Sequence, residues 1–341
     1  MVQSSPLPWW HPDEMARRRP FLEARARIIT GIRSFFTERG FLEVETPILQ
    51  TAPGMEVHLR AFATDLTDAL GRVPPRRLYL HTSPEFAMKK LLVGGLPRIF
   101  QMARVFRDGD ISPTHSPEFT MLEWYRAGAT YTDLMDDIEA LFAACGETRP
   151  VERLSVAEAF RRHAGGLDIL GTVSDPFAAE PAPDALKAAA AAIGVYVGEG
   201  DGWEDAFFHI FLDRIEPRLG LDGPVILYDW PACMAALSRR KPSDPRVCER
   251  FEVYVNGLEL ANAFGELTDP AEQRRRFEHS MQAKERLYGA GAVWPVEEDF
   301  LAALEHGLPD PCAGIALGVD RLVMVLTGAH RIEDVLWAPV A

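Results

Sequence analysis

The sequence of 341 residues has no long apolar run free of charge, few cysteines and no glycine-rich phosphate loop. A membrane-spanning helix needs about 18 or more consecutive apolar residues. The first twenty residues, MVQSSPLPWWHPDEMARRRP, have no apolar stretch behind a basic start, as a secretory signal would. We therefore expect neither a membrane span nor a secretory signal, and we infer a cytoplasmic protein.

The cysteines are widely separated and show no paired metal-ligand spacing. They are Cys145, Cys233, Cys248 and Cys312. Free buried thiols are the favoured interpretation over a zinc site, and redox chemistry is not indicated.

Acidic residues outnumber basic ones, 50 to 36, which gives a formal net charge of −14. This charge argues against a broad polyanion-binding face, although a local basic patch such as Arg17 to Arg19 is compatible with it. Nucleic acid is therefore a disfavoured partner.

The chain is long enough, and with 47% hydrophobic residues apolar enough, for a substantial core. We predict one domain over residues 14–341, preceded by an extension over residues 1–13. A segment rich in Ala, Pro and acids, at about 149–205, is interpreted as a helical insertion with a Pro-rich connector. An amphipathic helix is predicted to end near Gly40, and Pro47 in the following β-type run indicates an edge, a bend or a subunit contact.

Three apolar or aromatic runs between residues 78 and 126 predict antiparallel strands. In the last of them, HSPEFTMLEWYR, alternation places Glu123 on one face with Phe119, Met121 and Tyr125. A buried, unpaired carboxylate costs several kcal/mol, so Glu123 needs a proton or a cationic partner. The candidates are a basic residue of the chain, a metal ion or a cationic substrate.

The segment RFEVYVNGLELANAFGEL predicts a hairpin that turns at Asn256-Gly257. In that register Glu252 faces Ala261, and Glu252 and Glu259 are diagonal neighbours about 7 Å apart on one face. Carboxylates at this spacing suit Mg²⁺ held together with substrate phosphates. The other interpretation is a solvated face of the hairpin.

The polar residues that follow fall on the wrong face of a regular strand. Strict alternation places Asn262, Phe264 and Glu266 opposite to Glu259. One common site for all of them requires a β-bulge, for which the small alanines of the strand leave room.

Two arginines stand at the ends of structural elements. Arg107 follows a predicted strand, and Arg321 lies where GIALGVDRLVMVLTG turns at Gly318 from a strand into a helix. Either is compatible with a structural role, such as pairing of Arg321 with Asp320, or with binding phosphate oxygens. Without a glycine-rich loop, a nucleotide site here lies outside the P-loop and Rossmann designs.

Three segments in order resemble the signatures of class II aminoacyl-tRNA synthetases: GFLEVETPIL, VFRDGDISPTHSPEFTMLEWYR and GIALGVDRLVMVL. The segments TSPE, RFEVYVNGLELANAFGELTD and LEWY resemble the lysyl branch, and the resemblance covers residues 20–327. No room precedes the first signature for the OB-fold that reads the anticodon. The chain is therefore most similar to the elongation factor P lysine ligase family, which resembles the catalytic core alone.

This resemblance implies an α+β domain on an antiparallel sheet, and a homodimer through the region from Gly40 to Pro47. It also implies ATP and Mg²⁺, with Arg107 and Arg321 as catalytic residues. The implied ATP-binding residues are Arg107, Asp110, His115, Ser116, Phe119, Glu259, Leu260 and Arg321. The implied substrate-binding residues are Ser83, Glu85, Glu123, Tyr125, Asn262, Phe264, Glu266, Ala316 and Gly318. The implied metal ligands are Glu252 and Glu259.

In this scheme Arg107 holds the α-phosphate of ATP. Phe119 stacks on adenine, with Arg321 on its other side or on the γ-phosphate. Glu85 takes the substrate's α-type ammonium, and Glu123 is buried in order to neutralise a substrate ammonium.

The sequence departs from the family pattern at three positions. The glutamate that contacts adenine is replaced by Gly109, which Asp108 and Asp110 flank, and either acid is a possible substitute. Where the family often has an asparagine after the loop histidine, this chain has Ser116. Where synthetases of the lysyl type tend to have a glycine, this chain has Ala316. In the ligase family this position is associated with accepting β-lysine, although an alanine here is equally compatible with packing.

The implied reaction activates lysine or (R)-β-lysine as an adenylate and transfers it to a lysine side chain of elongation factor P. One alternative is a truncated synthetase that charges tRNA. Another is a non-catalytic paralogue that serves as a regulatory binding module. A third is an enzyme that forms an amide on a free amino acid, like ammonia-dependent asparagine synthetase, against which the acids Glu85 and Glu266 argue.

Overall fold

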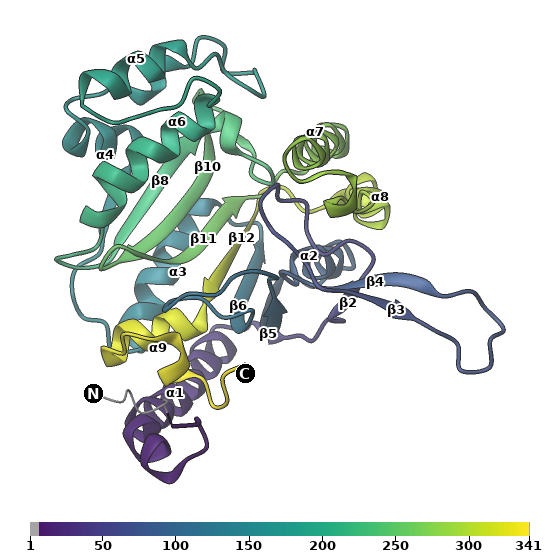
Figure 1. Ribbon diagram of the computed structural model, residues 1–341. Helices are drawn as coiled ribbons and strands as arrows, with labels where there is room; N and C mark the ends of the chain where they lie inside the picture. The colour runs from purple at the N-terminus through teal and green to yellow at the C-terminus, as the bar shows by residue number, and fades with distance from the viewer. Residues whose placement is uncertain (1–6, 341) are drawn as a thin grey trace.

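The computed structural model describes residues 7–340, which form a large sheet covered by helices and a smaller sheet at its side (Figure 1). The larger sheet has nine strands: β1 (Leu42–Glu43), β5 (Arg98–Phe106), β6 (Glu118–Ala127), β7 (Glu152–Ser155), β8 (Val225–Pro231), β9 (Arg240–Lys241), β10 (Asp244–Val255), β11 (Leu258–Gly265) and β12 (Cys312–Gly318). The strand order is β1-β5-β6-β12-β11-β10-β8-β7, with β9 paired to β10. The central pairs are antiparallel and the outer pairs β1/β5 and β7/β8 are parallel. The α+β fold on a mainly antiparallel sheet is as predicted.

The helices lie on both faces of this sheet. They are α1 (Pro12–Glu38), α2 (Glu85–Val93), α3 (Tyr131–Ala144), α4 (Val156–His163), α5 (Asp184–Ala192), α6 (Trp203–Ile210), α7 (Pro270–Tyr288), α8 (Glu298–Gly307), α9 (Val319–Thr327) and α10 (Ile332–Val335). Within residues 7–340 no helix is long and apolar enough to cross a membrane. The four cysteines are free thiols, two of them buried and two partly buried.

One face of the sheet is fully covered by α1, α3 and α9, which form the main hydrophobic core with it. Phe36 of α1 stacks on Phe100 of β5 with ring centroids 4.8 Å apart, and it also contacts Trp124 of β6. Helix α1 ends before Gly40, whose positive φ of 74° is accessible to glycine, as the sequence predicted. It begins at Pro12, earlier than the apolar periodicity indicates.

The opposite face is covered only at its two ends. Helices α2, α7 and α8 form one cluster at the β5–β6 end, and α4 and α6 form another over β8 and β10. Figure 1 shows the central strands β6, β12 and β11 between these two groups. The uncovered stretch is where the candidate site lies.

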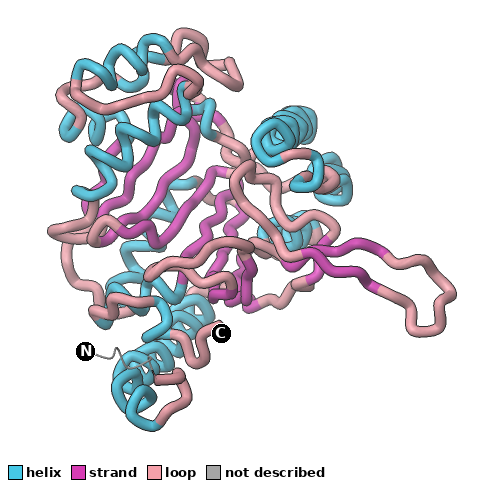
Figure 2. Tube along the Cα trace, viewed as in Figure 1, coloured by secondary structure: helices cyan, strands magenta, loops and turns pink. Residues whose placement is uncertain are grey.

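The smaller sheet contains β2 (Leu49–Gln50), β4 (Arg76–Leu80) and β3 (Ala63–Leu66), in that order. The run LYLHTS was predicted together with the two strands that follow it, but it forms β4 of this separate sheet. Pro47 lies between the short strands β1 and β2, which agrees with the predicted bend. Strands β3 and β4 and the loop between them project from the body as an arm (Figure 2).

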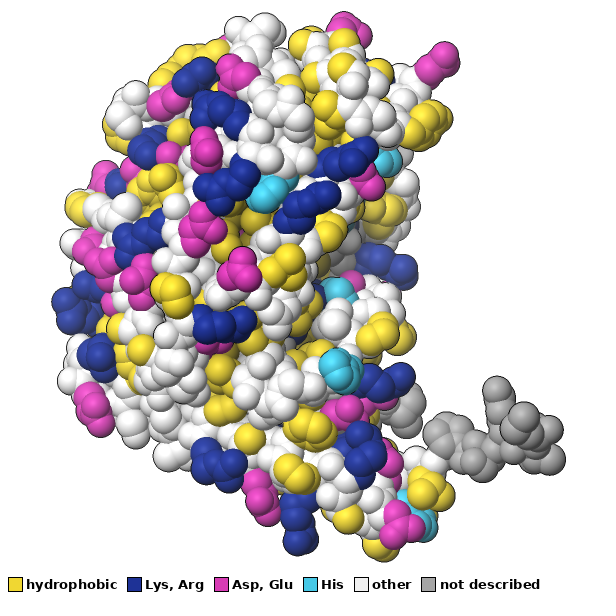
Figure 3. Space-filling model, turned by 90° about the vertical axis from the view of Figure 1, so that its left-hand side faces the viewer, with side chains coloured by type: hydrophobic (Ala, Val, Ile, Leu, Met, Phe, Trp, Pro, Cys, Tyr) yellow, Lys and Arg dark blue, Asp and Glu magenta, His cyan; other side chains and the backbone are white. Residues whose placement is uncertain are grey.

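The segment 149–205 contains strand β7, helices α4 and α5, a short 3-10 helix at Ile169–Thr172 and the start of α6, rather than helices alone. Strand β7 pairs in parallel with β8, and α4, α5 and α6 bury their apolar side chains in one cluster with β8 and β10. The division of the chain into a domain and an insertion stays a prediction. On the face drawn in Figure 3, Lys and Arg side chains are interspersed with Asp and Glu.

Candidate active site

A cavity of about 1620 Å³ lies over the central strands, between the two groups of helices. Every residue that the sequence predicted for the site lines this cavity except Glu266, which is buried beneath it. Pockets for a single small ligand measure about 300–1,000 Å³. This cavity therefore has room for more than one ligand.

The β10–β11 hairpin brings residues from both strands to the cavity through a bulge. Asn256 and Gly257 have φ values of 54° and 72°, as a tight primed turn requires. Tyr254 pairs with Glu259 as predicted, but Glu252 pairs with Asn262 and not with Ala261. The shift places Glu259 and Asn262 on the same face of the sheet, and the predicted bulge is confirmed.

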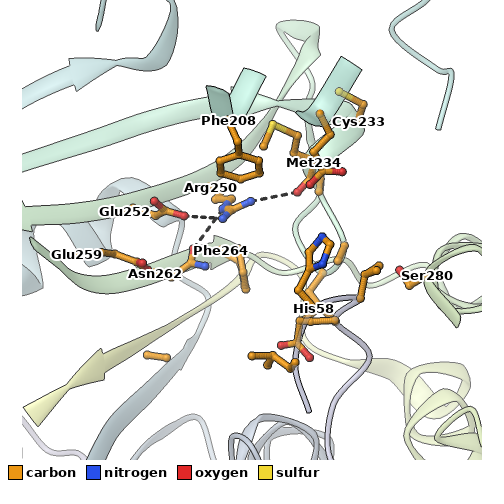
Figure 4. Close-up of a pocket in the computed structure, with 18 of the residues that line it drawn as sticks. His58, Phe208, Cys233, Met234, Arg250, Glu252, Glu259, Asn262, Phe264 and Ser280 are labelled. Carbon is orange, nitrogen blue, oxygen red and sulfur yellow. Dashed lines mark hydrogen bonds and ion pairs between the residues drawn. The ribbon is translucent and has the colours of Figure 1, made fainter. Parts of the chain in front are cut away.

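Four neighbouring strands contribute one residue each to a row across the cavity floor. Glu123 of β6 pairs with Ala316 of β12, Ala316 pairs with Asn262 of β11, and Asn262 pairs with Glu252 of β10. Figure 4 shows the Glu252, Glu259 and Asn262 part of this floor. Side chains far apart in sequence are thus held on rigid strands.

Glu123 is buried, with 1% of its surface exposed, and it has no basic partner in direct contact within the described chain. The Ser83 hydroxyl donates to its Oε1 at 2.6 Å, and the Tyr125 hydroxyl donates to its Oε2 at 2.9 Å. Burial, together with the nearby charge of Glu85, raises the pKa of Glu123 to about 8. Of the candidate partners of Glu123, a basic residue within the described chain is therefore not the one in contact with it.

A buried lysine that sequence reasoning missed lies beside the predicted acids. Lys89 of α2 forms ion pairs with Glu85 and, at 2.5 Å, with Glu266. Glu266 therefore already has a cation from the chain, although its Oε1 has no partner within residues 7–340. Lys89 follows Glu85 by four residues, the spacing of a helical ion pair, and this signal was present in the sequence.

Glycine is required at Gly314 of β12, next to this acidic end. A Cβ at this position would lie 2.1 Å from the Tyr125 ring and 2.5 Å from Oε1 of Glu266. Gly314 was not predicted as a site residue. Its lack of a side chain leaves the space that Tyr125 and Glu266 occupy.

At the other end of the floor, Arg107 follows β5 directly and faces the cavity. Its guanidinium lies 5.2 Å from the centroid of the Phe119 ring. Its Nε is buried and has no hydrogen-bond partner within residues 7–340. A buried orphan donor on a rigid strand end suits an anionic ligand.

Arg321 lies in the first turn of α9 and also faces the cavity. It donates to the carbonyl of Glu259 at 2.8 Å, and its Nη2 lies 2.5 Å from Nε2 of His115. Burial and the charge of Arg321 lower the pKa of His115, so the neutral ring accepts from Arg321 and donates through Nδ1 to Ser112.

Asp320 does not pair with Arg321. It accepts from buried Arg25 of α1 and, at 2.6 Å, from the backbone N–H of Thr120. This buried network fixes the turn that carries Arg321 against the start of β6. Arg25 was not predicted, and nothing in its helical context distinguishes it from surface arginines.

Of the two acids in the loop between β5 and β6, Asp110 faces the cavity. Asp108 pairs with Arg60 at 3.0 Å, whereas Asp110 lines the cavity near Arg321 and His115. Ser116 is buried in the same wall. Of the two acids that could replace the family's adenine-contacting glutamate, only Asp110 lines the cavity.

Glu252 and Glu259 are neighbours on the cavity floor. Glu252 accepts from Arg250 and from the Tyr254 hydroxyl, both at 2.5 Å, and Arg250 also donates to Asn262 at 3.3 Å. Burial and the like charge of Glu252 raise the pKa of Glu259. This pair of adjacent carboxylates fits a divalent cation, because carboxylate oxygens are the ligands that Mg²⁺ prefers. Arg250, two residues from Glu252 on the same strand face, was missed.

The cavity is thus divided by charge. Carboxylates surround its β6 and α2 end, whereas Arg107 and Arg321 flank its β5–α9 end and Glu252 and Glu259 lie on the hairpin. Such a site can bind a cationic group and a phosphate at once, and bring their carriers together.

Comparisons with known proteins agree with this geometry. Residues 14–340 match the family model of class II tRNA synthetases of the D, K and N type. A protein of Klebsiella pneumoniae named elongation factor P–(R)-β-lysine ligase is 42% identical over 329 residues, 96% of both chains. Proteins of the same name from Proteus mirabilis and Vibrio vulnificus are 42% and 40% identical over 97% of this chain, and over 97% and 98% of their own length. The chain belongs to the class II tRNA synthetase family, in its elongation factor P–(R)-β-lysine ligase branch.

Proposed function

We propose that this enzyme activates lysine or (R)-β-lysine with ATP and transfers it to the ε-amine of a lysine on elongation factor P. The observation that carries the proposal is Glu123, a buried carboxylate at a cavity wall without a cationic partner in direct contact. An ammonium group of the substrate supplies that partner. The names of the relatives, which contain (R)-β-lysine and elongation factor P, support this amino acid and this acceptor.

In the first step a carboxylate oxygen of the substrate attacks the α-phosphorus of ATP. A bond forms between that oxygen and phosphorus, the bond to the bridging oxygen breaks, and pyrophosphate leaves with the electron pair. Arg107 holds the α-phosphate, and Arg321 and Phe119 enclose the adenine. Hydrogen bonds hold Arg321 before substrate arrives, and Arg107 lies over the Phe119 ring with its Nε free of partners among residues 7–340, so the step depends on positioning and charge neutralisation.

Mg²⁺ bound by Glu252 and Glu259 would neutralise charge on the phosphates of ATP. The two carboxylates hold that position through the hairpin bulge, and Arg250 and Tyr254 orient Glu252. Asp110 takes over the contact to the adenine amino group that the family places at Gly109.

In the second step the unprotonated ε-amine of the acceptor lysine attacks the carbonyl carbon of the adenylate. A carbon–nitrogen bond forms, AMP leaves, and the amine gives up a proton. The product is an amide on the protein, and no tRNA takes part.

Ala316 supports β-lysine as the preferred substrate. Its methyl group lies on the floor between Glu123 and Asn262, where the substrate backbone has to pass. A β-amino acid carries its ammonium one carbon further from the carboxylate. One methyl group in a pocket typically discriminates by about 1–3 kcal/mol.

We also propose a homodimer through the region from Gly40 to Pro47. Exposed apolar side chains occur in and next to this region and on the adjoining small sheet: Leu42, Ile48, Leu49, Phe62 and Leu66. Exposed apolar side chains favour association, and a second copy is the partner that the family resemblance implies. Measurement of the molar mass in solution tests this; a monomer at micromolar concentration would contradict it.

The first experiment measures pyrophosphate exchange with ATP and Mg²⁺ for α-lysine, β-lysine and the other amino acids. Transfer of label to elongation factor P and to tRNA is then compared. We expect exchange with the lysines and label on the protein. Label on tRNA instead would indicate a truncated synthetase, and no exchange with any amino acid would indicate a binding module.

A further inference from the structure

Glu56 lies in the loop between β2 and β3, which forms part of the cavity wall. Its Oε2 is buried and has no hydrogen-bond partner within residues 7–340. The carboxylate packs against Gly54, where a Cβ would lie 2.5 Å from Oε2 of Glu56 and 2.8 Å from Oγ1 of Thr82. A glycine therefore makes room for a carboxylate whose Oε2 has no donor within residues 7–340.

The backbone of this loop is held in place from α7. Lys284 donates to the carbonyl of Leu59 and, at 3.3 Å, to that of Glu56, and its ammonium lies 3.6 Å from the Trp294 ring centroid. Burial lowers the pKa of Lys284 to about 8. Lys284 thus fixes the position of Glu56 through backbone carbonyls and makes no direct contact with its carboxylate.

Backbone contacts place Glu56 between the two ends of the cavity. Asp108, the neighbour of Arg107, donates its N–H to the carbonyl of Arg60 in the same loop at 3.0 Å, and Thr82, which precedes Ser83, lies beside Gly54 together with the Glu56 carboxylate. Burial raises the pKa of Glu56, Glu123 and Glu266, and the charge of Glu85 raises each further, whereas Arg107 lowers that of Glu56. Four carboxylates here face the ammonium groups of Lys89 and Lys284. This surplus of negative charge suits a substrate with two ammonium groups.

The three other carboxylates already have direct donors or an ion pair. Glu85 and Glu266 share Lys89, and Glu123 accepts from Ser83 and Tyr125. Arg107 marks the end where the substrate carboxylate meets the α-phosphate. Glu56 lies in the cavity wall between Arg107 and the Ser83–Glu85 segment, so it faces the part of the substrate next to its carboxylate.

On the basis of the proposed function, we propose that Glu56 is a further substrate-binding residue that, beside Glu85, pairs with the substrate ammonium nearest the reacting carboxylate. The distal ammonium is left to the Glu123, Tyr125 and Glu266 end. Glu56 thereby contributes to the choice between α- and β-lysine together with Ala316.

The test uses Glu56→Gln in the full-length protein and three compounds that differ at one amine. α-Lysine and β-lysine carry both ammonium groups, whereas 6-aminohexanoate lacks the proximal one. We expect KM for β-lysine in pyrophosphate exchange to rise about ten- to a hundredfold, the range for loss of a charged hydrogen bond. The inhibition constant of 6-aminohexanoate and KM for ATP should change by less than about twofold.

Glu118→Gln is the matched control, because Glu118 is an exposed acid of β6 that faces Arg104 at 3.9 Å. A second variant, Gly54→Ala, retains the charge of Glu56 but displaces its carboxylate, and should weaken β-lysine in the same direction. Equal shifts for β-lysine and 6-aminohexanoate, or unchanged KM for β-lysine in both variants, would overturn the inference. Absence of exchange by the unmodified enzyme with either lysine would instead overturn the proposed function, and the inference with it.

Discussion

Replacing Glu123 by Gln tests whether this carboxylate is present for the substrate or for the fold. Glu123 is fully buried, accepts two hydroxyl hydrogen bonds, and has a pKa raised from 4.5 to about 8. Gln has the same size and retains hydrogen bonding to Ser83 and Tyr125. The substitution therefore removes the charge and little else.

The raised pKa means that ionised Glu123 destabilises the empty protein. At pH below 4.5 the carboxyl is protonated in both the folded and unfolded states, and the stability of the wild type falls as pH rises from 4.5 to about 8. At about 1.36 kcal/mol per pKa unit, the destabilisation above pH 8 is at most about 5 kcal/mol. We expect Glu123→Gln to raise the free energy of unfolding at pH 8 and leave it nearly unchanged at pH 4.5.

The same substitution should weaken substrate binding. KM for lysine in pyrophosphate exchange should rise about ten- to a hundredfold, because a charged hydrogen bond is lost. In the wild type, KM should also rise by up to about tenfold per pH unit below 8, since protonated Glu123 cannot pair with an ammonium. This dependence should be shallower in the variant.

Thermal unfolding at pH 4.5 to 9 and exchange kinetics at pH 6 to 9 measure both effects, with Glu118→Gln as the control. A variant that is less stable at pH 8, with unchanged KM for lysine, would refute the reasoning, because Glu123 would then be a structural residue.

Four further predictions concern the rest of the site. Arg107→Ala should lower kcat for exchange by about a hundredfold or more while the melting temperature stays the same, because its orphan Nε has no partner in the chain to lose; a large fall in melting temperature would contradict this. Glu259→Gln should raise the Mg²⁺ concentration for half-maximal activity and leave lysine binding unchanged, as a Mg²⁺ titration would show. Gly314→Ala should destabilise the protein by about 1–3 kcal/mol in denaturant unfolding, because its Cβ overlaps the Tyr125 ring. Ala316→Gly should shift the ratio of kcat/KM from β-lysine towards α-lysine, by at most about a hundredfold.

The parts of the fold that were predictable from the sequence have a local physical cause. Alternation alone placed Glu123 and Tyr125 on one face of β6, because a strand has a side-chain period of two. Asn256-Gly257 predicted the hairpin turn. The bulge was predicted because Glu259 and Asn262 can share one site only if a bulge brings them to the same face, and the structure contains it. The predicted pairing of Glu252 with Ala261 was wrong because the position of a bulge depends on packing against β12 and β8, which the hairpin sequence does not contain.

Other features depend on contacts between distant segments. Arg250 looks like an ordinary charged residue in the sequence, yet it contacts Glu252, a predicted site residue. The spacing of Lys89 from Glu85 indicates a helical ion pair, but its contact with Glu266 depends on a segment far away in the sequence. Glu56 belongs to no motif, and its position follows from Lys284, more than 200 residues away. LYLHTS has the pattern of a strand, but which sheet it joins is decided by its partners β2 and β3.

The acids of the cavity link stability to function. Glu56, Glu123 and Glu259 each have a raised pKa, so each opposes folding of the empty protein as pH rises. A ligand that binds only the folded state stabilises it by an amount set by its concentration and affinity. A diamine that neutralises Glu56 and Glu123 should therefore raise the melting temperature more at pH 8 than at pH 6, where protons already neutralise part of their charge. The cost of keeping the acids buried is offset when the substrate binds, which is why the chain itself leaves them only partly compensated.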